Sequence, residues 1–116
     1  MSADCIFCKI VDRTIPSPLV YDDSEVVAFQ DINPQAAHHL LIIPRQHFAD
    51  VGEAAAAGEG ALLGKILTVA AELAKARNLA ATGYRLVCNT GKDGGQTVRH
   101  LHVHLLGGRP LGWPPG

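Results

Sequence analysis

Three short runs of β-branched and aromatic residues dominate the hydrophobic pattern in the first part of the chain. They span residues 19–23, 25–32 and 38–44 and predict three strands. Polar residues at 22–24 predict a turn between the first two strands. The third run ends at Pro44, which has no N–H to donate to a β-ladder. This part of the sequence therefore predicts a hairpin followed by one more strand.

The apolar period becomes helical between residues 60 and 78. The apolar positions of this segment are Leu62, Ile66, Val69 and Leu73. Because they recur every three or four residues, with charged residues elsewhere on the wheel, they predict one long amphipathic helix. The low-complexity segment EAAAAGEG at 53–60 is expected to be a loop.

Two further strands are predicted at 83–89 and 98–106, on either side of the glycine-rich segment TGKDGG. The tail RPLGWPPG is too rich in proline and glycine to join a sheet. The order strand, strand, strand, helix, strand, strand predicts an α+β fold, an antiparallel five-stranded sheet with a helix packed on one face. We expect a single domain over residues 1–116, since a chain of this length can bury a core without disulfides.

Composition and charge exclude several classes of partner. The net charge is −1 and the charged residues are spread along the chain, so the basic stripe of a nucleic-acid groove is missing from the sequence. No apolar run reaches the roughly 18 residues of a membrane span, and the N-terminus lacks a signal-peptide pattern. Three cysteines, an odd number, do not make a secreted disulfide framework. We expect a cytoplasmic protein that binds neither nucleic acid nor membranes.

All six histidines fall in two short stretches, 38–47 and 100–104. In a strand over 98–106, His100, His102 and His104 would line one face, and the alternating apolar residues would face the core. A metal ion would take at most two of the three, because the first and third would lie about 13 Å apart along a strand. Alternatively, a neutral imidazole whose Nδ1–H is tied to a carbonyl presents Nε2 as a nucleophile, which suits attack on phosphorus.

The segment NTGKDGGQTV, directly before the histidine row, has features of a phosphate-binding loop. Its glycines allow close backbone approach, and Asn89, Gln96 and Thr97 offer side-chain donors. Taken alone, the same segment also fits an ordinary hairpin connection. Its position beside the histidines favours the phosphate site.

At these residues the chain resembles the histidine triad (HIT) nucleotide-binding proteins, whose signature is His-x-His-x-His followed by apolar residues. The resemblance covers nearly the whole chain, in the family's order, through CIFCKI, IPS, AFQDINPQA, HLLIIPRQH, NTGKDGGQTVRHLHVHLLGGRP and GWPPG. The GGQ loop and the tail are most similar to the Hint branch, the purine nucleoside phosphoramidases. The resemblance implies a HIT-like fold with one long and one short helix, and a homodimer whose sheets join across the interface.

The resemblance implies a division of labour among the polar residues. His102 matches the family's nucleophile, which is transiently nucleotidylated, and His100 the residue whose carbonyl holds its Nδ1–H. His104 and His39 match two histidines around the phosphate and leaving group. Asn89, Gln96 and Thr97 match positions that contact the phosphate and leaving group or order the site. Thr97 stands where many Hint-like proteins have serine, which keeps the hydroxyl but adds a β-branch.

The implied ligands are purine nucleotides, namely AMP, GMP and their phosphoramidates or acyl-adenylates. Asp31 matches a carboxylate that binds the ribose hydroxyls. The residues that match the apolar pocket around the base are Phe7, Ile10, Ile15, Phe29 and Ile32. In Hint-like homodimers the C-terminal segment reaches the neighbour's site, so Trp113 is a candidate specificity element; the alternative is an aromatic that only pins the tail.

The resemblance also suggests a zinc site formed by Cys5, Cys8, His47 and His100. A Cys₂His₂ set suits a closed structural site. Many Hint-branch proteins keep the fold without metal, and the alternative is two buried thiols packed against the first helix. No cofactor is required for the chemistry in either case. Cys88, inside a predicted strand, is expected in the core.

Two other functions stay open at this point. One is the hydrolysis or phosphorolysis of dinucleoside polyphosphates, as in another branch of the superfamily. The GGRPLGWPPG ending, which is similar to that of the Hint branch, disfavours this function. The other is a nucleotide-binding regulator without turnover. His38, beside His39, is interpreted as incidental, because alternation would turn it to the opposite face of its strand.

Overall fold

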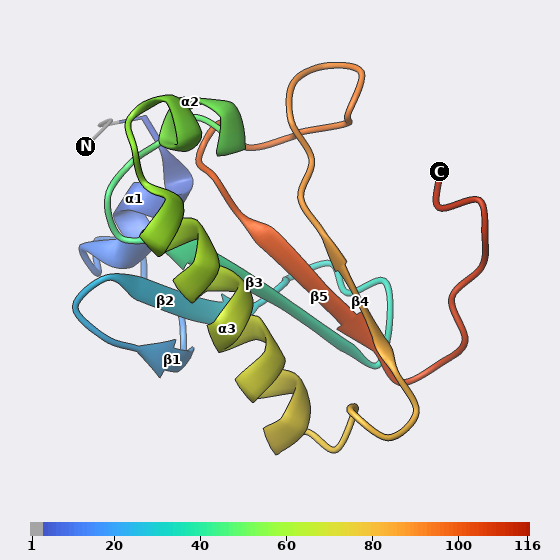
Figure 1. Cartoon of the computed structure of the whole chain (residues 1–116). Coiled ribbons are helices and arrows are strands. Elements are labelled where there is room, and N and C mark those ends of the chain that lie inside the picture. Colours follow the sequence, from blue (N-terminus) through green and yellow to red (C-terminus); the bar gives the residue numbers. More distant parts are fainter. Residues whose placement is uncertain (1–3) are drawn as a thin grey trace.

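A computed structural model describes residues 4–116, so the first three residues of the expected 1–116 domain lie outside the described range. A five-stranded antiparallel sheet with strand order β1-β2-β3-β5-β4 forms its centre (Figure 1). The strands are β1 (Leu19–Asp22), β2 (Val26–Gln30), β3 (His38–Pro44), β4 (Tyr84–Val87) and β5 (Val103–Gly107). The helices are α1 (Ile6–Val11), α2 (Val51–Ala56) and α3 (Gly60–Ala76).

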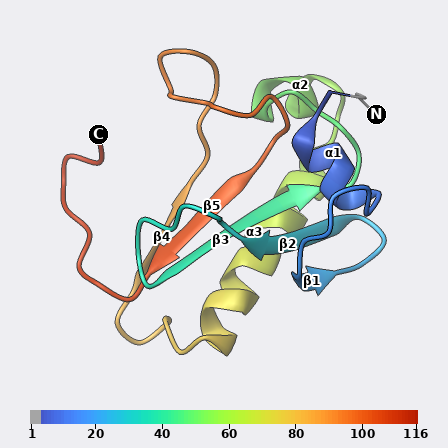
Figure 2. The same cartoon turned by 180° about the vertical axis from the view of Figure 1, so that it is seen from behind.

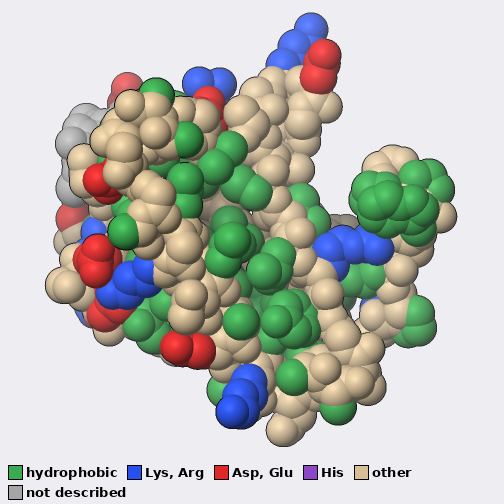
Figure 3. Space-filling view, in the orientation of Figure 1, with side chains coloured by type: hydrophobic (Ala, Val, Ile, Leu, Met, Phe, Trp, Pro, Cys, Tyr) green, Lys and Arg blue, Asp and Glu red, His purple; other side chains and the backbone are tan. Residues whose placement is uncertain are grey.

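The two faces of the sheet are covered by different helices. α3 crosses one face, while α1 lies against the other face near β2 and β3 (Figures 1 and 2). Leu40 and Ile42 of β3 belong to the core under α3, whereas Leu41 and Ile43 belong to a smaller core under α1. Burial on both faces explains why β3 has a continuous apolar sequence rather than an alternating one. On the α3 side, apolar side chains gather in the middle of the surface (Figure 3).

The prediction of five antiparallel strands and one long helix is confirmed, but the segment 53–60 is not all loop. Asp50 caps α2, because its Oδ1 accepts a hydrogen bond of 2.9 Å from the N–H of Glu53. The Glu53 carboxylate in turn accepts from the N–H of Ala49 at 3.2 Å. The pair resembles a capping box, although Glu53 reaches the N–H of the residue before the N-cap, and it is followed by alanines, which are strong helix formers. Within residues 4–116 the fold therefore has two short helices, α1 and α2, where the resemblance implied one.

The strand expected at 98–106 begins only at Val103, and the strand expected at 83–89 spans Tyr84–Val87. The register that pairs Ile42 with Val103 would place Pro44 opposite Leu101. Because Pro44 has no N–H, the ladder stops before that position, and the N–H of Leu101 donates to Phe48 O at 2.7 Å. His100 and His102 therefore precede the strand, and the prediction that they lie on it is wrong.

Among residues 4–116, no helix has the length and hydropathy needed to cross a membrane. The long helix α3 instead faces the sheet with a buried stripe that includes Ile66 and Val69.

We expect Ile66→Ala to lower the free energy of unfolding by about 2–5 kcal/mol, because it leaves a cavity under α3 where the side chain is 1% exposed. The matched control is Leu67→Ala on the same helix, where the side chain is 50% exposed and the loss should stay within about 1 kcal/mol. Urea denaturation measures both. Equal losses would contradict the packing described here.

Candidate active site

A cavity of about 310 Å³ opens on the α1 face of the sheet. It is lined by Ile6, Phe7, Ile10, Ile15, Pro16, Ser17, Phe29, Gln30, Asp31, Ile32, Leu41, Thr97, Val98, His102 and His104. All five apolar residues expected around a base are among them, with Asp31 beside them. Ile32 is 98% exposed and therefore stands at the mouth. Such a slot can take a flat apolar group, with polar side chains at one end.

His102 is held in one tautomer at the polar end of the cavity. Its Nδ1–H donates to the carbonyl oxygen of His100 at 2.7 Å. Phe7 packs edge-to-face on the ring, with centroids 5.2 Å apart. Because Nδ1 carries the proton, Nε2 keeps its lone pair, and the side chain is only 4% exposed. The arrangement is that of a positioned nitrogen nucleophile or base.

His104, His39 and Asp31 form a hydrogen-bonded chain beside His102. The N–H of Gln35 donates to His39 Nδ1 at 3.0 Å, so the proton of the neutral ring is on Nε2. The Nε2–H of His39 donates to His104 Nδ1 at 2.8 Å. Asp31 Oδ2 lies 3.4 Å from His39 Nε2. His104 therefore accepts at Nδ1 and carries its own proton on Nε2. The rings of His102 and His104 lie 5.0 Å apart.

Burial keeps this chain of imidazoles neutral. It lowers the pKa of His104 to about 4, and the charges of His102 and His39 would lower it further, while Asp31 opposes the shift. Burial also lowers the pKa of His39, again against the pull of Asp31. At neutral pH His39 and His104 are therefore neutral N–H donors rather than positive charges.

Gln96 closes the glycine-rich loop instead of lining the cavity. Its Oε1 accepts from the N–H of Gly91 at 3.0 Å, and its Nε2 donates to Ala49 O at 2.6 Å and Val98 O at 2.9 Å. Gly94 is needed in this loop, since a Cβ there would lie 2.4 Å from Thr90 O. Charged side chains project at the tip of the loop (Figure 3). The hydrogen bonds of Gln96 fix the backbone on either side of Thr97, which does line the cavity.

Two other candidate residues lie away from this cavity. Asn89 is half-buried shortly after β4 and is not among the lining residues. Trp113 is 82% exposed in the C-terminal tail, which runs out beyond β4 on the side opposite α1 (Figures 1 and 2). Arg85 holds the tail by donating to Gly112 O at 2.7 Å. Trp113 therefore cannot close the cavity of its own chain in this arrangement.

A second polar cluster brings together Cys5, Cys8, His47 and His100, whose ligand atoms all lie within 4.8 Å of one another. Cys5 Sγ lies 3.3 Å from His100 Nδ1, and Cys8 Sγ lies 3.3 Å from His47 Nδ1. The two Nδ1 atoms are 3.2 Å apart. Around a tetrahedral zinc ion, ligand nitrogens lie about 3.3 Å apart, and sulfur and nitrogen about 3.5 Å apart. The cluster thus has the dimensions of a four-ligand metal site.

The surroundings of this cluster prepare its atoms as ligands. His100 Nε2–H donates to Pro44 O at 2.9 Å, which leaves Nδ1 unprotonated. Burial lowers the pKa of His100 to about 4, so the ring is neutral. Cys5 is the N-cap of α1, and its Sγ accepts from the N–H of Cys8 at 3.3 Å. These four residues can hold a metal ion.

His38 and Cys88, the two remaining residues considered in the sequence, both lie outside the cavity. His38 lies near Arg77, with Nδ1 3.3 Å from the guanidinium, and is not among the residues that line the cavity. Cys88 is exposed just after β4 ends at Val87, so the expectation that it belongs to the core is wrong. The strand stops before it, and its side chain has no core face to occupy.

Comparison with known proteins places these features in a family context. The HIT domain family pattern matches residues 12–111. The chain is 52% identical to the purine nucleoside phosphoramidase of Escherichia coli (strain K12) over 112 residues, which is 97% of this chain and 93% of that protein. It is 53% identical to an uncharacterized HIT-like protein of Synechococcus elongatus over the full length of both chains.

Solved structures agree with the sequence relatives. A HIT family hydrolase from Legionella pneumophila Philadelphia 1 superposes with a TM-score of 0.93 at 49% identity, covering 97% of this chain and 100% of that one. A histidine triad protein from Clostridium difficile gives a TM-score of 0.92 at 41% identity, with 97% and 96% coverage.

We expect Gln96→Met to loosen the loop between β4 and β5, because it removes three hydrogen bonds while keeping the length of the side chain. Hydrogen exchange should show a faster Gly91 amide than in the wild type. The control is the exposed Gln46→Met, which should leave the exchange of Gly91 unchanged. An unchanged Gly91 amide in Gln96→Met would contradict the role given to this side chain.

Proposed function

The chain belongs to the HIT domain family, and from this premise we propose that it hydrolyses adducts of purine nucleoside monophosphates. The bond that breaks is the P–N bond of a phosphoramidate, which releases an amine, or the P–O bond of an acyl-phosphate, which releases a carboxylate. The observation that carries the proposal is the tautomer of His102, whose Nδ1–H is committed to His100 O while Nε2 remains available at the polar end of an apolar cavity. The name of the Escherichia coli relative, a purine nucleoside phosphoramidase, supports the same reaction.

In the proposed first step, the Nε2 lone pair of His102 attacks phosphorus. The P–N bond breaks, its electron pair goes to the leaving nitrogen, and that nitrogen takes a proton from solvent water to depart as an amine. In the second step a water molecule attacks the phosphorus of the nucleotidyl-histidine, gives up a proton, and releases the nucleoside monophosphate while His102 regains its lone pair. No cofactor enters either step.

The neighbouring polar groups support the charge and the proton transfers of this reaction. The Nε2–H of His104 is a donor for a phosphate oxygen, since its Nδ1 already accepts from His39. The hydroxyl of Thr97, on the cavity wall, can relay a proton to the leaving nitrogen. An anionic phosphate in the cavity favours protonated imidazole, so substrate binding would raise the pKa of these histidines and increase the fraction that carries a proton to donate.

The nucleoside would occupy the apolar part of the cavity. Phe7 and Phe29 meet edge-to-face with centroids 5.4 Å apart and form a wall for the base. Asp31 Oδ1 already accepts from the N–H of Asn33 at 2.8 Å, which holds the carboxylate at the cavity edge, where it can bind the ribose hydroxyls. An apolar slot discriminates weakly between adenine and guanine, so we propose both as bases.

We also propose that two chains join through β4. Among residues 4–116 this strand lies at one edge of the sheet, where a strand of a second chain could pair with it. The tail with the exposed Trp113 leaves the body on that same side (Figure 1), so it would reach the partner rather than its own cavity.

Zinc is the metal we propose for the Cys5, Cys8, His47 and His100 cluster. Two thiolates and two imidazoles are the donor set of closed structural zinc sites. When bound, the ion supplies a cross-link between α1, the segment after β3 and the segment before β5, and takes no part in the reaction. The side chain of His100 would bind the metal, while its backbone carbonyl accepts the hydrogen bond from His102.

We expect His102→Ala to reduce the release of AMP from adenosine 5′-phosphoramidate by about 10³-fold or more, because the attacking atom is lost. Binding of AMP, measured by calorimetry, should remain, since the apolar slot and Asp31 are unchanged. The matched control is His38→Ala on β3, which should keep wild-type turnover. Substantial turnover by His102→Ala would exclude His102 as the nucleophile. If the wild type acted only on diadenosine polyphosphates, the protein would instead be a dinucleoside polyphosphate hydrolase or phosphorylase.

Metal analysis tests the zinc proposal with a matched pair of cysteine variants. Purified wild type and Cys88→Ser should each contain about one zinc per chain, whereas Cys8→Ser should lose it. Chelation should lower the thermal midpoint of the wild type but leave AMP release by the folded protein unchanged. Zinc retained in Cys8→Ser would exclude this site.

A further inference from the structure

A second hollow lies beside the cavity, and we propose that it binds the leaving group of the substrate and that Arg99 selects an amine that carries a carboxylate. This inference rests on the proposed function and adds a substrate class to it.

The second hollow has a volume of about 390 Å³. It is lined by Asp4, Cys5, Ile6, His47, Ala49, Thr97, Val98 and Arg99. Three of these residues, Ile6, Thr97 and Val98, also line the nucleotide cavity. The two hollows therefore lie on either side of a short wall, in which Thr97 supplies the hydroxyl.

The position of this wall fits the path of a leaving group. With the base in the apolar slot and phosphorus at His102, the bond that breaks points away from His102, because attack and departure are in line. Thr97 is the residue proposed to protonate the leaving nitrogen, so that nitrogen must pass beside it. A substituent on the nitrogen then extends beyond Thr97 into the second hollow.

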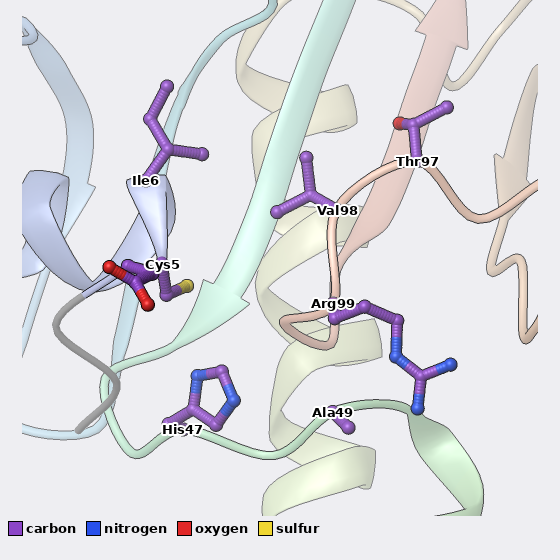
Figure 4. Close-up of a pocket in the computed structure, with 8 residues that line it drawn as sticks. Cys5, Ile6, His47, Ala49, Thr97, Val98 and Arg99 are labelled. Carbon is purple, nitrogen blue, oxygen red and sulfur yellow. The ribbon is translucent and has the colours of Figure 1, made fainter.

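Arg99 gives this hollow a chemical preference. Its side chain is 65% exposed, and among residues 4–116 its one charged contact is to Asp50 Oδ2 at 3.7 Å, which is long for an ion pair. The other oxygen of Asp50 is occupied in capping α2. The guanidinium lies across the hollow from Cys5 and His47 (Figure 4) and keeps donors for a carboxylate. Asp4 on the same lining carries a like charge, which limits the size of the expected preference.

The test compares two adenosine 5′-phosphoramidates that differ in one charge. One carries glycine through its nitrogen and has a free carboxylate; the other carries glycinamide, which is neutral and of nearly the same size. We expect kcat/KM of the wild type to favour the glycine adduct by about two- to fivefold, the range of a partly exposed ion pair. The preference should shrink as salt is raised, because screening weakens exposed charges.

Arg99→Gln should bring the ratio of the two kcat/KM values to about one, because glutamine keeps a polar side chain without the charge. Arg77→Gln is the matched control, an arginine near His38 that lines neither hollow, and should keep the wild-type ratio. A ratio that is unchanged in Arg99→Gln, or a wild type that prefers glycinamide, would overturn the inference. Failure of the wild type to hydrolyse unsubstituted adenosine 5′-phosphoramidate would instead overturn the proposed function.

Discussion

The hydrogen bond between His102 Nδ1–H and the carbonyl oxygen of His100 is the contact on which the site depends. It decides which ring nitrogen carries the proton, and so which nitrogen faces the cavity. The same residue, His100, turns its side chain the other way, with Nε2–H on Pro44 O and Nδ1 in the Cys/His cluster. One residue thus connects the cavity to the cluster, and a metal bound there would stiffen the carbonyl that orients His102.

Pro44 makes this double use of His100 possible. It ends the ladder between β3 and β5, so the backbone at 98–102 leaves the strand geometry that would have placed three histidines in one row. Its carbonyl oxygen lies where the ladder with β5 has ended, and it accepts a hydrogen bond from the Nε2–H of His100 at 2.9 Å. Without that break, His100 would face the same side as His102 and His104, and the two clusters could not form separately.

The sequence predicts the parts of this protein whose signal is local and misses those set by contacts between distant segments. The hydrophobic period predicts β3 and α3 well, since each follows one regular pattern over many residues. The break at Val103 depends on Pro44, which lies far away in sequence and only becomes a neighbour in the folded sheet. α2 was predictable in principle from Asp50 and Glu53, an N-terminal cap before alanines, but the low complexity of the segment suggested a loop. The resemblance to the HIT family also grouped Cys5 and Cys8 with two histidines, yet the tautomers of the ring nitrogens need the partners that only the structure supplies.

The neutral histidines of the cavity have a thermodynamic consequence for the whole fold. An unfolded chain binds a proton on each imidazole near pH 6.5, whereas the pKa of buried His104 is about 4. Between these values the unfolded state binds more protons than the folded state, so stability is lost as the pH falls from about 6.5 towards 4. An anion in the cavity opposes this loss, because it favours the protonated ring in the folded state. In the proposed function, the protonation of these histidines is therefore linked to phosphate binding, since a bound anion would offset part of the stability that is lost as the pH falls.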